Sequence, residues 1–116
     1  MSDFHAFVDE LLAGLGPVRI KRMFGGAGVY AGEVMFGLVD DDVLYLKADD
    51  ALKADLAAAG SAGWVYSRAP GKWADTSYWR LPEAALDDPD EAVAWARRAL
   101  AVATARAAQK RPKRKR

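Results

Sequence analysis

Residues 18–48 read VRIKRMFGGAGVYAGEVMFGLVDDDVLYLKA, and this stretch decides the fold. Apolar residues recur within it at every second position, as in Leu44 and Leu46 on either side of Tyr45. A period of two is typical of β-strands with one buried face. Glycines and aspartates separate the repeats, and these connections are too short for parallel crossovers. The stretch therefore predicts successive antiparallel strands.

The alternation also predicts which side chains share a face of the sheet. Val34, Phe36 and Leu38 form one alternating set, with Met35 and Gly37 between them. Because successive side chains of a strand point to opposite faces, we expect the first set to be buried together.

Helix signals flank these strands. An apolar stripe of period 3.6 predicts a helix over residues 3–15, and an aspartate cap and a glycine stop bracket a short helix over 49–60. Two further strands are expected near 64–68 and 76–81. An Asp-Pro-Asp-Glu start predicts a long alanine-rich helix over 88–109. The order predicts an α+β domain in two layers, with helices on one face of an antiparallel sheet.

The length and composition of the chain predict one compact domain. The 116 residues are 52% hydrophobic and 28% charged, which suits a single core. No apolar run reaches the ~20 residues that cross a bilayer, and the N-terminus lacks a signal-peptide pattern, so we expect a cytoplasmic protein that makes no membrane contact. The chain has no cysteine and a single histidine, His5, which excludes disulfides, thiolate catalysis and multi-histidine metal sites.

Three short motifs invite a functional interpretation, and a structural one fits each better. The glycine-rich residues 25–28 lack the Lys-Ser/Thr of a phosphate-binding loop and are expected to form a hairpin or bulge with close backbone packing. The aspartates at 40–42 lack the spacing of a calcium loop and predict a solvated turn. His5 has no evident nucleophile to activate. We therefore predict no catalytic, cofactor-binding or metal-binding residues, and a protein that is not an enzyme.

The pattern Tyr-x-Lys/Arg occurs three times in predicted strands. Each pair lies two residues apart, so its tyrosine and its cation point to the same side of the sheet. Such a face suits three roles: plain cross-strand pairing, a protein interface such as a homodimer contact, or a nucleic-acid or small-ligand surface. The predicted interaction surface consists of Tyr45, Lys47, Tyr66, Arg68, Tyr78 and Arg80.

The charge is divided along the chain. Residues 1–109 hold 11 basic and 16 acidic side chains, a net charge of −5, and the remainder is strongly cationic. We expect 1–109 to form the domain and 110–116 a disordered basic tail. Such a tail either contacts nucleic acid through counterion release or serves as a solubilising end. Its predicted contacts are Lys110, Arg111, Lys113, Arg114, Lys115 and Arg116.

Several of these motifs, in this order, resemble the N-terminal domain of the TfoX/Sxy family of bacterial competence regulators and their short relatives. The resemblance extends over about residues 8–103. Its motifs are MFGG at 23–26 with Gly28, MFGL at 35–38, LYLK at 44–47, SYW at 77–79 with Leu81 and Pro82, and the region of Trp95.

The resemblance implies a fold and a role. It implies a two-layer α+β fold like that of secretion chaperones, and a regulatory function beside transcription proteins, since full-length members act with the cyclic-AMP receptor protein. Those members carry a second, C-terminal domain where this chain has the basic tail, so functions of that domain are not expected. We predict a non-enzymatic regulatory or adaptor protein, with a small-ligand module on the tyrosine-cation face as the alternative.

Overall fold

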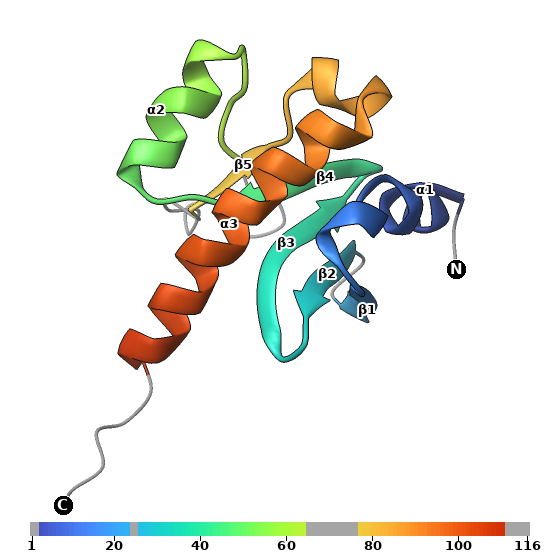
Figure 1. The fold of residues 1–116 in the computed structure, drawn as a ribbon, viewed down its shortest axis with the longest axis horizontal. Coiled ribbons are helices and arrows are strands. Elements are labelled where there is room, and N and C mark those ends of the chain that lie inside the picture. The colour runs from blue at the N-terminus through green and yellow to red at the C-terminus, as the bar shows by residue number, and fades with distance from the viewer. Residues whose placement is uncertain (1–2, 24–25, 65–76, 111–116) are drawn as a thin grey trace, which may run out of the picture.

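The computed structural model describes residues 3–23, 26–64 and 77–110, which form an α+β fold (Figure 1). Helices precede and follow an antiparallel sheet, as the sequence predicts. The elements are α1 (Asp3–Leu11), the 3-10 turn η1 (Ala13–Leu15), β1 (Arg19–Met23), β2 (Gly26–Ala31), β3 (Val34–Asp40), β4 (Val43–Lys47), α2 (Asp50–Ala58), β5 (Tyr78–Arg80), the 3-10 turn η2 (Glu83–Asp87) and α3 (Pro89–Lys110).

The sheet has five strands in the order β1-β2-β3-β4-β5, and every neighbouring pair is antiparallel. β1 therefore lies at one edge, and its Arg19, Lys21 and Arg22 are exposed. Next to β5, Gly63 forms an isolated bridge with Trp79. The strand expected over 64–68 lies outside the described residues except for Trp64.

The core lies between one face of the sheet and the helices. α3 crosses β3 and β4, α1 lies beside it, and the last turns of α3 continue past the sheet (Figure 1). Small side chains allow this close crossing, because α3 faces the core with a stripe of alanines. The core includes Val8 and Leu11 of α1, Leu12 just after it, Leu44 and Leu46 of β4, Leu52 and Leu56 of α2, and Ala92, Ala96, Ala99 and Ala103 of α3.

A β-bulge in β3 changes the predicted assignment of side chains to faces. Val29 pairs with Gly37 and Tyr30 pairs with Met35, which leaves Phe36 as an extra residue. The bulge puts two successive residues on one side and inverts the alternation beyond them. The expectation that Leu38 shares a face with Phe36 is therefore wrong: Phe36 joins the core at 0% exposure, and Leu38 lies opposite Tyr45 on the other face at 7%.

Caps and turns delimit the helices close to their predicted bounds. The carboxylate of Asp49 accepts the backbone N–H of Leu52 at 2.9 Å, and that of Asp88 accepts the N–H of Glu91 at 3.2 Å. The first helix ends earlier than predicted, because η1 tightens its last residues into a 3-10 turn. Among the described residues, no helix combines the length and the apolarity needed to cross a membrane.

Candidate interaction face and adjoining cavity

The face of the sheet away from the helices, here called the outer face, carries four of the six predicted surface residues. Tyr45 lies opposite Arg80, and Lys47 lies opposite Tyr78. The pair between them, Leu46 and Trp79, points to the core side. Tyr66 and Arg68 lie outside the described residues.

Antiparallel pairing explains why the Tyr-x-Lys/Arg pattern repeats. Each tyrosine of β4 or β5 faces the cation of the other strand, so the two motifs interlock. The ammonium of Lys47 lies 4.9 Å from the centre of the Tyr78 ring, within the range of a cation-π interaction. Part of the pattern therefore serves cross-strand pairing, and both tyrosines remain partly exposed.

Trp64 completes an aromatic cluster on this face, defined as Tyr45, Trp64 and Tyr78. The ring of Trp64 lies 6.0 Å from that of Tyr45 and 6.5 Å, edge to face, from that of Tyr78. Its indole N–H donates to a carboxylate oxygen of Asp40 at 3.1 Å, and its backbone N–H donates to the carbonyl of Tyr78 at 2.8 Å. The sequence-based face omits Trp64 because it was built only from Tyr-x-Lys/Arg pairs, although Trp64 lies two residues before Tyr66 in the strand predicted over 64–68.

A second group on the outer face joins β1, β2 and β3. The guanidinium carbon of Arg19 lies 5.2 Å from the centre of the Tyr30 ring, and Tyr30 pairs with Met35. A Cβ at Gly28 would come within 2.9 Å of the Tyr30 ring and 3.2 Å of the Met35 sulfur, so the glycine provides the room for both side chains. The sequence-based face also omits Tyr30. Its position between the apolar Val29 and Ala31, which contribute to the core side, indicates that its side chain points to the outer face.

Burial raises the pKa of both outer-face tyrosines of β4 and β5. Desolvation is the largest cause for Tyr45, where Arg80 lowers the pKa and Asp40 and Asp41 raise it. Desolvation also raises the pKa of Tyr78, and the nearby Tyr30 adds to the rise. Both hydroxyls are therefore protonated near neutral pH and can donate or accept hydrogen bonds.

The charge of the outer face differs from that of the whole domain. Four cations, Arg19, Lys21, Lys47 and Arg80, project from its strands. The carboxylate of Asp40 lies among them and binds Trp64. The described part of this face is thus positively charged although residues 1–109 carry a net charge of −5, and it suits an acidic partner surface.

A cavity of about 230 Å³ opens where this face meets the C-terminal part of α3. Its position is set by the start of β3, the end of β4 and the start of β5, over which α3 passes. Cations, a hydroxyl and apolar side chains converge there. The lining residues are Glu33, Val34, Met35, Lys47, Tyr78, Ala103, Arg106 and Ala107.

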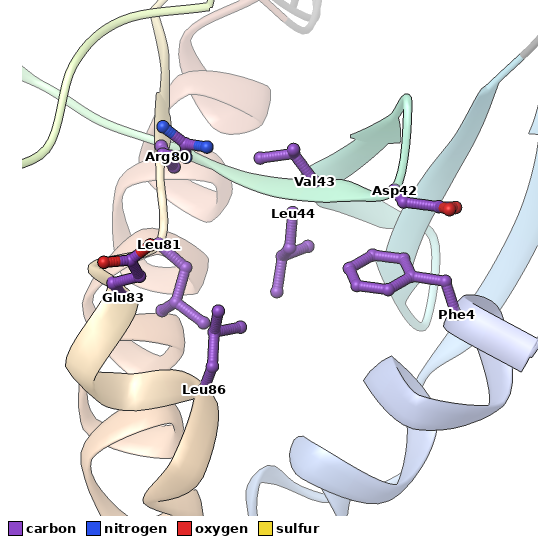
Figure 2. A pocket seen from close by; sticks show the side chains of 8 residues that line it. All are labelled: Phe4, Asp42, Val43, Leu44, Arg80, Leu81, Glu83 and Leu86. Atoms are coloured by element: carbon purple, nitrogen blue, oxygen red, sulfur yellow. The ribbon is translucent and has the colours of Figure 1, made fainter.

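A second hollow, of about 110 Å³, lies at the opposite end of β4 (Figure 2). Phe4, Leu44, Leu81 and Leu86 point toward one another and form its apolar floor, while the charged ends of Arg80 and Glu83 point away. The hollow is small and no polar groups converge in it, so it is a gap at the margin of the core.

The remaining predicted residues lie elsewhere. Lys110 is the last residue of α3, and residues 111–116, with the other predicted tail contacts, lie outside the described part. His5 is half-buried in the first turns of α1. Within residues 3–23, 26–64 and 77–110, no three His, Asp or Glu side chains cluster as metal ligands would.

Comparison with known proteins identifies the family. No curated protein matches the chain. The TfoX N-terminal domain, in contrast, matches residues 10–103, from the end of α1 to the alanine stripe of α3. The match includes all five strands of the sheet and the four paired residues of the outer face. Because it extends over most of the 116 residues, the chain belongs to the TfoX N-terminal domain family.

Proposed function

We propose that this protein is a regulatory adaptor related to competence and transcription, and that it is not an enzyme. Its family suggests a competence-related regulatory role and is not a known enzyme family. The adaptor acts in the cytoplasm, binds a second copy of itself or a transcription protein through the outer face, and touches nucleic acid through its basic tail.

The observation that carries this proposal is the composition of the outer face. Half-buried tyrosines and Trp64 lie between cations on a face opposite the helix-covered core. Tyrosine, tryptophan, methionine and arginine are enriched at protein interfaces, and the cations favour an acidic partner.

A charge reversal tests the face. We expect Arg80→Glu to weaken self-association in sedimentation velocity, and capture of purified cyclic-AMP receptor protein, by at least about tenfold, because a repelled charge at an interface costs several kcal/mol. Arg97→Glu is the matched control, since Arg97 is exposed on α3. Equal weakening by both variants, or a wild-type protein that binds neither partner, would contradict the proposal.

A salt titration tests the tail. Full-length protein and a chain of residues 1–109 are titrated with duplex DNA between 50 and 200 mM salt, and fluorescence anisotropy reports binding. Six cations that meet phosphates give a log-log slope of about −5, so we expect strong salt dependence for the full chain and loss of binding for 1–109. Equal, salt-insensitive affinities would remove nucleic acid from the proposal.

A small-ligand module is the second candidate function, and the cavity of about 230 Å³ favours it. The cavity combines apolar walls with polar groups from the outer face and α3, which is the usual make-up of ligand sites.

A further inference from the structure

The cavity beside α3 contains a cation that has no ion-pair partner among the described residues. Arg106 is half-buried, and its guanidinium makes no hydrogen bond or ion pair in the part of the chain that the structure describes. Arg98, two turns earlier on α3, is more exposed and yet pairs with Asp55 at 2.8 Å. Removing a cation from water without a partner is costly, so the position of Arg106 favours an anion.

A second cation lies in the same cavity. Lys47 lines it from β4, and its ammonium is held 4.9 Å from the centre of the Tyr78 ring. Tyr78 also lines the cavity, with a hydroxyl that burial keeps protonated. Glu33 is the acidic member of the lining and is exposed in the β2–β3 turn, where water screens its charge. Among the described lining residues, two cations and one carboxylate leave a positive balance of charge.

The other walls are apolar and the space is small. Ala103 and Ala107 of α3 face Val34 and Met35 of β3 across it. A volume of about 230 Å³ lies below the range of about 300–1,000 Å³ that holds drug-sized ligands. A guanidinium recognises a carboxylate in a bidentate manner, and the alanines offer an apolar wall to a short hydrocarbon body.

We propose that this cavity binds a small organic carboxylate, with Arg106 as the main anchor, Lys47 as the second cation and the hydrocarbon body against Ala103 and Ala107. The inference rests on the second candidate function and names its ligand class. It is independent of partner binding by Arg80 and of DNA binding by the tail, so those experiments can fail while this one succeeds.

Benzoate is the probe that tests the proposal, with the full-length protein followed by ¹H–¹⁵N correlation spectra. Benzyl alcohol and benzylamine have the same ring with a neutral or a cationic head. We expect saturable shifts around the cavity with benzoate at a dissociation constant on the order of 1 mM, a scale that suits a ligand of this size. Benzyl alcohol should bind at least about tenfold more weakly, and benzylamine should not bind.

Three variants distinguish a specific role of Arg106 from a general effect of positive charge. Arg106→Gln should weaken benzoate binding at least about tenfold, and Lys47→Gln by a smaller factor, while Arg97→Gln on the exposed side of α3 should leave it within about twofold. The spectra also show that each variant is folded. Equal shifts with all three probes, unchanged affinity in Arg106→Gln, or no benzoate binding by the wild-type protein would each overturn the proposal.

Discussion

The two faces of the sheet are buried by different chemistry. The helix-covered face carries aliphatic side chains and Phe36, packed against alanines of α3 to nearly complete burial. The outer face carries half-buried tyrosines and Trp64, together with mostly exposed cations, and several of these side chains contact one another through their rings. The first arrangement maximises the apolar area removed from water, and the second keeps polar groups accessible. Stability should therefore depend on the first face and binding on the second.

Truncation of the Phe36 side chain on the helix-covered face should cause the largest loss of stability. Its side chain is fully buried at the bulge, so Phe36→Ala should lower the free energy of unfolding by about 3–5 kcal/mol in a urea titration. Tyr45→Ala on the outer face should cost only about 1 kcal/mol. Equal losses for the two variants would show that both faces contribute alike to stability.

Enlarging an alanine of α3 tests how tightly the helix lies on the sheet. Ala99 is fully buried, and Ala99→Leu should lower stability by about 1–3 kcal/mol because the added atoms have no space. Ala101→Leu on the exposed side of the same helix should change it by less than about 0.5 kcal/mol. A neutral Ala99→Leu would mean that α3 can move away from the sheet without cost.

Alkaline pH should lower the free energy of unfolding through Tyr78 on the outer face. The loss should be smaller than that caused by either core substitution. The pKa of Tyr78 is raised in the folded state above the value of about 10 in an unfolded chain, so the folded protein holds this proton more tightly. The resulting stability is present below about pH 10 and is lost as pH rises through the folded pKa. Between about pH 9 and 11, Tyr78→Phe should lose less unfolding free energy than the wild-type protein. Parallel losses would count against the burial of this hydroxyl.

A substitution in the turn between β3 and β4, which sets the register of these strands, should change the free energy of unfolding least. Asp41 and Asp42 have φ values of 54° and 58°, which glycine adopts more easily than aspartate. Asp42→Gly should therefore raise the free energy of unfolding by a few tenths of a kcal/mol, up to about 1 kcal/mol, and preserve the pairing of Tyr45 with Arg80. A loss of stability on this substitution would mean that the aspartate side chain, and not the backbone, holds the turn.

Much of the fold follows from local signals in the sequence. Asp49 and Asp88 lie at the starts of α2 and α3 as caps, and the alanines of α3 face the core as expected. Leu38 was misassigned because a bulge adds one residue to the spacing, and nothing in an alternating apolar run marks the extra one. The early end of α1 has a similar cause, since the apolar stripe continues through η1.

The outer face was only partly predictable. The spacing of Tyr45 with Lys47 and of Tyr78 with Arg80 is enough to put each pair on one side of a strand. Trp64 shares the alternation of Tyr66 in the strand predicted over 64–68 and could have been assigned to the face, whereas Arg106 needed the tertiary structure because it reaches the cavity from a helix that overhangs the sheet. Cavities form between elements distant in sequence, so strand periodicity could not indicate this one.

The cations of β1 also limit how copies of this protein can stack. An open edge strand can extend its sheet into a neighbour, and repeated extension leads to fibrous aggregates. Arg19, Lys21 and Arg22 would face their own counterparts in such a stack, and like charges at that spacing repel. Edge-to-edge extension along β1 is thereby discouraged.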